Sequence, residues 1–203
     1  MLLSLGTATV AIVLVVLLPG PDTLVVMRNL VRGGRSLGTR TAIGNLCGLA
    51  IWVCLTSLGV TAVLRASEIG YDVLRVAGAV YLLWLGLALW RSRAGVDPEP
   101  SARRGLLGSG FTAGILTNLL NPKVGVFFIA FLPQFVPAGW PTGTAMLVLG
   151  VEFIVVTAAY WALLIGLASR VGGWMATPRV RRRMDRLTGT ILIAFGIRLA
   201  TES

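Results

Sequence analysis

Six long apolar blocks, separated by short polar breaks, set the strongest constraint on how this chain can fold. They occupy residues 5–18 continuing to 31, 41–64, 74–90, 106–135, 144–168 and 187–200. A soluble domain of 203 residues, 56% of them hydrophobic, could not cover so much apolar surface. The blocks are continuous rather than alternating, and about 20 apolar residues in a helix cross a bilayer core of about 30 Å. We therefore predict an all-α, polytopic membrane protein with six transmembrane helices.

The positive charge is distributed according to the same blocks. A net charge of +10 could indicate nucleic-acid binding, but the basic residues gather in alternate breaks, as the positive-inside rule describes. These breaks contain Arg28, Arg32, Arg35 and Arg40, then Arg91, Arg93, Arg103 and Arg104, then Arg170, Arg179, Arg181, Arg182, Arg183 and Arg186. The pattern predicts membrane lipid rather than nucleic acid as a partner, with the Arg-rich loops in the cytoplasm and both termini outside.

The two halves of the chain resemble each other. Pro21-Asp22 in the first block and Pro122-Lys123 in the fourth stand at matching positions, and a polar break lies between the halves. Since each half has three blocks, the halves would insert in opposite orientations, which is the inverted-repeat arrangement of many secondary transporters. We predict a single transporter domain over residues 1–203, with repeats at about 1–91 and 105–203 and a cytoplasmic linker at 92–104.

Prolines interrupt the first and fourth blocks, so helices 1 and 4 are expected to be broken. A proline inside a helix costs about 3 kcal/mol unless the helix restarts there. Asn121 is a favourable N-cap and Pro122 a favourable first helical residue, and Gly20 and Pro21 can fill the same positions. Restarted half-helices would present free backbone N–H groups that attract carboxylates near the bilayer centre. These four residues are therefore predicted to bind substrate, with an ordinary proline kink as the alternative at either site.

Lys123 is the only lysine in the chain, and residues 106–135 carry no other charge. A charged side chain at bilayer depth costs about 2.5–3.5 kcal/mol on insertion scales, so it usually marks a functional site. The positive charge of Lys123 opposes the positive end of its own half-helix. Capping therefore does not explain the residue, and we expect an anionic partner, either a substrate carboxylate or a protein carboxylate such as Glu152.

Two carboxylates and one amide complete the predicted site. Asp22 suits the positive end of its half-helix and could meet the ammonium group of a substrate. Glu152 lies in residues 147–168, which have no other charge, and its alternatives are a structural ion pair with Lys123 or proton carriage. Asp22 is the other candidate for proton coupling. Asn45 could bind substrate, although an interhelical hydrogen bond is its simpler role.

The remaining distinctive residues are expected to be structural. The pairs Gly44/Gly48 and Gly110/Gly114 fit close helix packing. The two cysteines lie about 10 Å apart on one helix, too far for a disulfide, and without histidine no metal or cofactor is expected. The tryptophans are expected to be interfacial anchors, namely Trp52, Trp84, Trp90, Trp140, Trp161 and Trp174.

The motifs of the chain resemble those of a known family of exporters. In chain order they are Pro19-Gly20-Pro21-Asp22, the glycines Gly33, Gly38, Gly44 and Gly48, then Gly114, Asn118, Asn121-Pro122-Lys123, Phe127-Phe128 and Pro133-Gln134-Phe135. Over essentially the whole chain they resemble the LysE/RhtB family of amino-acid exporters. The resemblance implies a bacterial inner (cytoplasmic) membrane exporter of amino acids or close derivatives, driven by proton antiport, and adds Asn118 to the substrate-binding candidates. The family commonly has Asn after Pro-Gly-Pro, so Asp22 departs from its pattern.

Three other functions compete with amino-acid export. Export of another small solute or a cation is less favoured, because the sequence has few convergent carboxylates. A membrane-embedded enzyme is also less favoured, because the sequence has no histidine and no serine or cysteine in a nucleophile setting. A scaffold without transport predicts that Lys123 and Asp22 can be replaced without effect. The sequence favours a non-enzymatic secondary transporter whose partners are a small-molecule amino acid and protons. It leaves open which amino acid is exported and whether the chain forms a homo-oligomer.

Overall fold

The fold consists of helices throughout the part of the chain that the computed structural model describes, residues 2–66, 68–91, 109–167 and 177–201. In order these are α1 (Leu2–Leu17), α2 (Pro21–Ala66), α3 (Glu68–Arg91), α5 (Phe111–Leu119), α6 (Pro122–Val126), the π-helix η1 (Phe127–Phe131), the 3-10 helix η2 (Leu132–Phe135), α7 (Thr142–Gly166) and α9 (Pro178–Thr201). No strand occurs within these ranges, so the prediction of an all-α chain is confirmed.

Both predicted helix breaks are present. The first lies between the end of α1 at Leu17 and the start of α2 at Pro21. At the second, α5 ends at Leu119 and α6 restarts at Pro122, with Asn121 as its N-cap. The helical directions on the two sides of this second break differ by 48°. Each proline is therefore the first residue of a new helix rather than a kink inside one.

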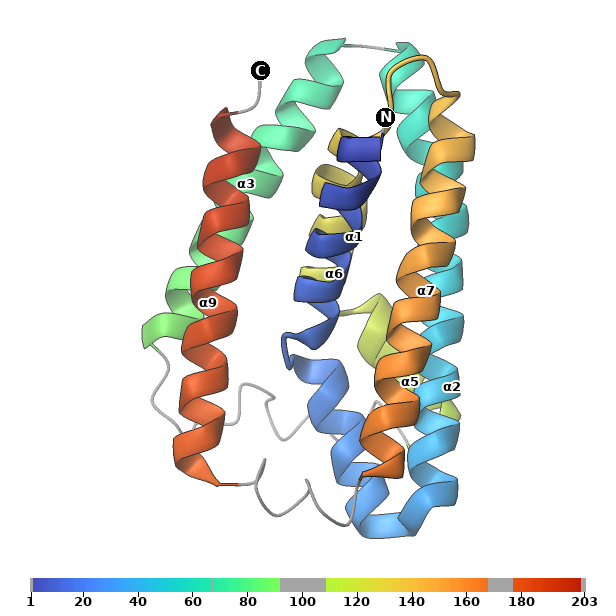
Figure 1. Cartoon of the computed structure of the whole chain (residues 1–203), viewed down its shortest axis with the longest axis vertical. Coiled ribbons are helices and arrows are strands. Elements are labelled where there is room, and N and C mark those ends of the chain that lie inside the picture. The colour runs from blue at the N-terminus through green and yellow to red at the C-terminus, as the bar shows by residue number, and fades with distance from the viewer. Residues whose placement is uncertain (1, 67, 92–108, 168–176, 202–203) are drawn as a thin grey trace.

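A further interruption divides α2 at Gly33 and Gly34, within the polar break predicted between the first and second apolar blocks. Gly34 has a φ of 67°, a backbone conformation that favours glycine. Across the bend the Asn29 amide donates a hydrogen bond of 2.9 Å to the Thr41 hydroxyl. The helix thus consists of a short arm, residues 21–32, and a long arm, residues 35–66. The two arms run in opposite directions, as Figure 1 shows.

Two described helices are long and apolar enough to cross a membrane, within Pro21–Gly59 and Thr142–Gly166. A third candidate is the bent pair Gly110–Leu119 and Pro122–Phe135 taken as one span. Shorter apolar helices occupy Gly6–Leu17 and Val76–Arg91. Length and composition therefore identify two or three spans in the described ranges, and six spans stay a prediction.

The N-terminus and the C-terminal end of α9 lie at the same end of the molecule, while the bend in α2 lies at the other end (Figure 1). The end of α7 and the start of α9 also lie at the end that holds the α2 bend. There the Arg35 guanidinium donates to the carbonyl oxygen of Gly166 at 3.4 Å. A cation at the carboxyl end of α7 is favourable because it meets the negative end of the helix dipole.

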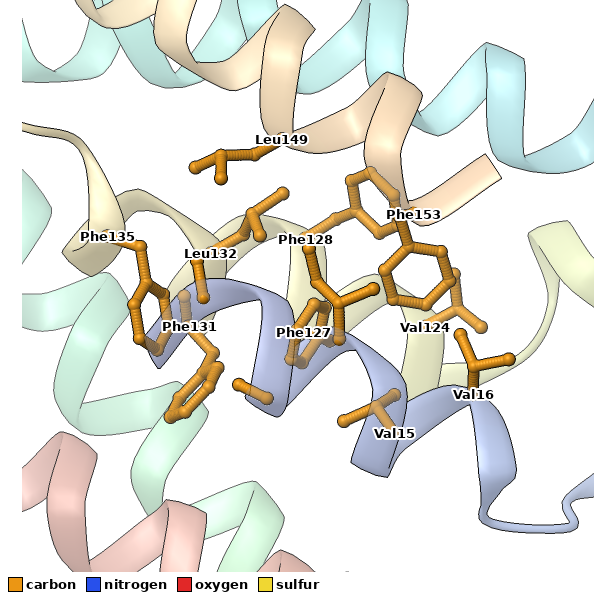
Figure 2. Packing of buried hydrophobic residues seen from close by; sticks show 14 of the residues in the cluster. Val15, Val16, Val124, Phe127, Phe128, Phe131, Leu132, Phe135, Leu149 and Phe153 are labelled. Carbon is orange, nitrogen blue, oxygen red and sulfur yellow. The ribbon is translucent and has the colours of Figure 1, made fainter. Parts of the chain in front are cut away.

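Aromatic side chains of η1 fill the space between α1, α7 and α9. Phe127 and Phe128 lie 5.4 and 5.1 Å from the ring of Phe153 on α7. Phe131 stacks on Phe195 of α9 at 4.4 Å. Figure 2 shows Phe128 beside Phe153 between the ribbons of α1 and α7, and Phe131 on the side of α1 that faces away from α7. The η1 rings and Phe153 belong to one buried cluster that also contains residues of α1, so their packing fixes where the second broken helix lies relative to the first.

Glycines set the distance between α5 and the long arm of α2. A Cβ on Gly44 would collide with the Phe111 backbone, and a Cβ on Gly114 would collide with the carbonyl oxygen of Thr41. A Cβ on Gly48 would lie 2.8 Å from the Cβ of Asn118. The predicted packing role of Gly44, Gly48 and Gly114 is therefore confirmed, since only glycine allows this approach.

The helices α3 and α9 form a second closely packed pair, which lies beside the rest of the molecule in Figure 1. A Cβ on Gly86 would lie 2.7 Å from the carbonyl oxygen of Gly189, and one on Gly189 would lie 2.6 Å from that of Gly86. Close to this crossing the Trp90 indole donates to the Thr190 hydroxyl at 2.9 Å. Trp90 is thus half of a helix–helix contact as well as an exposed aromatic residue.

Replacing Gly114 with valine should destabilise the protein by about 3 kcal/mol, because the new side chain meets backbone atoms that cannot move aside. Thermal unfolding of the detergent-solubilised protein measures the change. Gly59→Ala is the matched control, since a Cβ there has nothing within 4 Å, and it should leave stability equal or slightly higher. Equal stability of the two variants would contradict the packing described here.

Candidate functional site

The two helix breaks meet inside the molecule, and Lys123 joins them. Its ammonium Nζ donates to the carbonyl oxygen of Leu18 at 2.9 Å and to that of Val15 at 3.3 Å. These are carbonyl groups at the end of α1, where no further turn of helix supplies a donor. Lys123, only 8% exposed, therefore caps the carboxyl end of the other broken helix.

Gly20 makes this reach of the lysine side chain possible. A Cβ on Gly20 would lie 3.3 Å from the ammonium of Lys123 and 3.6 Å from its Cε. The contact with the ammonium is tighter than most Cβ contacts, whereas the distance to Cε is an ordinary van der Waals contact, so a larger residue at position 20 would push the ammonium by a few tenths of an ångström. The glycine of the first proline motif thus accommodates the lysine of the second.

Asn121 connects the same two breaks through its side-chain amide. Its Oδ1 accepts a hydrogen bond of 3.0 Å from the backbone N–H of Lys123, which confirms its predicted role as N-cap. Its Nδ2 donates to Oδ2 of Asp22 at 2.7 Å. A single amide therefore caps α6 and binds the carboxylate at the start of α2.

Asp22 carries the negative charge of this polar cluster. Its carboxylate and the ammonium of Lys123 attract each other, with Asn121 bonded to both residues. The Asn45 amide lies near the same carboxylate without reaching the geometry of a hydrogen bond. Oδ1 of Asp22 and Nδ2 of Asn45 are buried and have no hydrogen-bond partner within the described residues.

A cavity of about 30 Å³ adjoins the cluster. Its polar lining includes four predicted site residues, Asp22, Asn45, Asn118 and Lys123. Oδ1 of Asn118 is a third buried polar atom that lacks a partner in the described ranges. The rest of the lining comes from α1, the break that follows it, α2, α6 and α7, namely Val15, Val16, Leu18, Thr23, Leu49, Val124, Phe153, Thr157, Tyr160 and Trp161.

The wall contributed by α7 was missed by the sequence reading. Trp161, expected to be an interfacial anchor, is 3% exposed and donates from Nε1 to Oδ1 of Asn45 at 3.1 Å. That expectation is wrong for Trp161, because the indole is needed to satisfy a buried amide. The bond does confirm the interhelical role foreseen for Asn45. A spacing of four residues, Phe153, Thr157 and Trp161, puts these side chains on one face of α7 and was the available signal.

The structure also corrects the expectation for Lys123. Its charge does oppose the start of its own half-helix, but the fold gives it another role at the end of α1. The statement that capping does not explain the lysine is therefore wrong. Within the described residues Lys123 has no ion pair with Glu152, which is half-buried and does not line the cavity.

Comparison with known proteins places the chain in a family. Residues 13–203 match the LysE type translocator family. The chain belongs to the LysE family. An uncharacterized membrane protein of Pseudomonas aeruginosa is 34% identical to this LysE-family chain, covering 97% of the chain and 94% of its own length. A homoserine/homoserine lactone efflux protein of Salmonella typhi is 31% identical, and the match covers 90% of the chain and 89% of that protein. No solved structure matches significantly.

The family membership agrees with the apolar helices. The relatives that match nearly the full length include proteins named as membrane proteins and as efflux proteins. This LysE-family chain is thus a multi-pass membrane protein of an exporter family, and the resemblance stated from its motifs is confirmed.

Replacing Lys123 with methionine should destabilise this LysE-family protein by about 3–5 kcal/mol, because the Asp22 carboxylate loses its buried counter-charge. When Asp22→Asn is added to Lys123→Met, the double variant should regain at least about 1 kcal/mol of the lost stability, since no uncompensated charge is left. A double-mutant cycle of unfolding in detergent measures the coupling. If the two single losses simply add, the charges do not interact and the description of the cluster is wrong.

Proposed function

We propose that the chain is a secondary transporter that exports amino acids or close derivatives across the bacterial inner membrane by proton antiport. The observation that carries the proposal is the cavity where the two broken helices meet, lined by a buried carboxylate and a buried ammonium. Charged groups at bilayer depth are costly to bury and typically mark the path of a substrate or ion.

Six transmembrane passes in two inverted repeats, about 1–91 and 105–203, are the architecture we propose for this domain. Several features support it. Each half has one helix broken at a proline, and the third helices of the two halves, α3 and α9, pack on each other. The start of α1 and the end of α9 lie at one end of the molecule in Figure 1. Broken helices that meet in the middle are where such transporters bind their substrates.

The orientation follows from the arginines. Arg35 lies at the end of the molecule opposite both termini, bonded to the end of α7. We propose that this end faces the cytoplasm and that the termini lie outside. The predicted cytoplasmic linker, residues 92–104, lies outside the described residues.

An amino-acid substrate is supported by the polar groups at the cavity. Asp22 would accept from an ammonium group, as predicted from the sequence, and Asn45 and Asn118 offer further polar contacts. A relative that covers most of the chain is named a homoserine/homoserine lactone efflux protein, which suggests a compact amino acid or its derivative. Gly20, Pro21, Asn121 and Pro122 act by shaping the two breaks that place these groups.

Export requires the cavity to change its size. At about 30 Å³ it is far below the roughly 300–1,000 Å³ of ordinary ligand pockets, so an amino acid enters only when the helices around it separate. We propose that the two repeats rock against each other and expose the cavity to one side at a time. Asp22 would carry either a proton or a bound substrate ammonium, but not both at once. This exclusion would couple the movement of protons to the movement of substrate.

Purified protein in liposomes should export amino acids when a pH gradient is imposed. The assay uses a panel of labelled amino acids that includes homoserine, with Asp22→Asn as the test variant and Val155→Ala, an exposed position on α7, as the control. Asp22→Asn should reduce the rate at least about 100-fold, since it removes the coupling carboxylate. If no member of the panel moves through the unmodified protein, the export function is wrong, and a scaffold role gains support.

Glu152 is the second carboxylate that we assign to proton carriage. If it relays protons to Asp22, Glu152→Gln should lower proton-driven transport while leaving exchange of labelled for unlabelled amino acid across the liposome membrane unchanged, because exchange needs no net proton movement. Equal rates for Glu152→Gln and the unmodified protein in both assays would remove Glu152 from the coupling path.

A further inference from the structure

We propose that the start of α9, together with the end of α3, binds the headgroup of an anionic phospholipid. Four exposed arginines on α9 form the surface, and we call them the arginine stripe: Arg179, Arg182, Arg183 and Arg186. None of them lines the cavity between the broken helices, so this is a second surface and the inference goes beyond the proposed export.

The arginine stripe lies on one face of α9. Counted from Arg179, its other members stand three, four and seven residues along the helix, and residues at these spacings share a face. Like charges at such spacings repel each other, and positive charges in the first turns of a helix also oppose its dipole. The arrangement is therefore unfavourable by itself and is relieved by a bound anion.

Acidic residues near the arginine stripe in the sequence are too few to neutralise it. Residues 178–186 hold five arginines and one acidic residue, Asp185. The segment 92–108, which follows α3, has two acidic residues against three arginines, and the segment 168–176, which precedes α9, has one arginine and no acidic residue. Each of these stretches is net positive, so the anion that balances the stripe comes from outside the chain.

The end of α3 adds a further positive charge beside the arginine stripe. The two helices run antiparallel, because Gly86 meets Gly189 near one end of the crossing and Gly78 lies against Leu199 near the other. Exposed Arg91, the last residue of α3, therefore lies near the level of Arg186. The start of α9 extends beyond the end of α3, toward the end of the molecule that holds the α2 bend (Figure 1).

The guanidinium of Arg186 is held in a geometry that suits a phosphate group. Its Cζ lies over the ring of Trp90, 5.5 Å from the centroid. The Trp90 indole is itself fixed, because its Nε1 donates to the Thr190 hydroxyl at 2.9 Å. A guanidinium that packs its face on an aromatic ring keeps the N–H groups at its edge free, and two of them can bind two phosphate oxygens at once.

Exposed apolar side chains begin where the arginine stripe ends, which identifies the anion as a lipid. Leu87 and Trp90 on α3 and Leu187 and Ile197 on α9 are all exposed. Residues 187–197 of α9 carry no charge, so the helix changes from basic to apolar at one level, as at the boundary between headgroups and acyl chains. A phospholipid places its phosphate on the stripe and its acyl chains along this apolar surface, which a soluble anion would leave uncovered.

Binding to the purified, delipidated full-length chain in detergent tests the inference. The probes are phosphatidylglycerol, phosphatidylcholine and inorganic phosphate, and the readouts are the unfolding temperature and the lipid affinity from native mass spectrometry. Phosphatidylglycerol should raise the unfolding temperature by at least about 3 °C, because a ligand that binds only the folded state stabilises it. Phosphatidylcholine, which has no net charge, and phosphate, which has no acyl chains, should each raise it by less than about 1 °C.

The double variant Arg182→Gln/Arg183→Gln removes two charges from the arginine stripe. It should bind phosphatidylglycerol about 10–30-fold more weakly, because each arginine beside an anionic headgroup contributes several-fold to the affinity. Arg32→Gln/Arg40→Gln is the matched control, since it removes the same charge from exposed positions of α2. The control should change the affinity by less than about twofold, because charges away from the bound headgroup are screened by salt.

Three outcomes would overturn the inference. Equal weakening in the two double variants would show that the lipid responds to net charge and not to the arginine stripe. Equal stabilisation by phosphatidylglycerol and inorganic phosphate would show that no lipid is needed. Without added lipid, Arg182→Gln/Arg183→Gln should unfold within about 1 °C of the unmodified chain, as expected for exposed side chains. A larger drop would show that the arginines serve another part of the chain.

Discussion

The contact between the Lys123 ammonium and the end of α1 is the interaction on which the centre of this protein depends. A helix that ends in the interior leaves carbonyl oxygens without donors, and a lysine in the interior needs acceptors. Bonds to Leu18 and Val15 meet both needs at once. Since α1 and α6 belong to different halves of the chain, the contact also fixes how the halves meet.

The rest of the centre follows from that junction. Asn121 caps α6 and binds Asp22, so the negative charge stays beside the lysine that balances it. Aromatic rings of η1 pack around the junction, and glycines bring α5 close to the long arm of α2. Polar groups that would be unfavourable singly are thus held in a rigid apolar setting, with a few atoms left free to meet a ligand.

Much of this arrangement could be predicted from the sequence, because it depends on local chemistry. Prolines and Asn121 specify where helices restart, and their capping preferences operate within a few residues. The role of Lys123 could not be read in the same way, since its acceptors lie 105 and 108 residues earlier in the chain. Trp161 was misassigned for a similar reason, because its partner Asn45 belongs to another helix.

The sequence by itself determined the helical fold, the positions of the two breaks, the family and the residues that carry charge into the interior. Hydrophobic block length, proline geometry and the rarity of buried charge are properties that short segments express alone. The tertiary structure decided which groups meet: that Lys123 donates to backbone carbonyls of α1 and is balanced by Asp22, that Glu152 lies outside the cavity wall, and that α7 supplies one side of the site. Those outcomes depend on the relative placement of whole helices, which packing between distant segments sets.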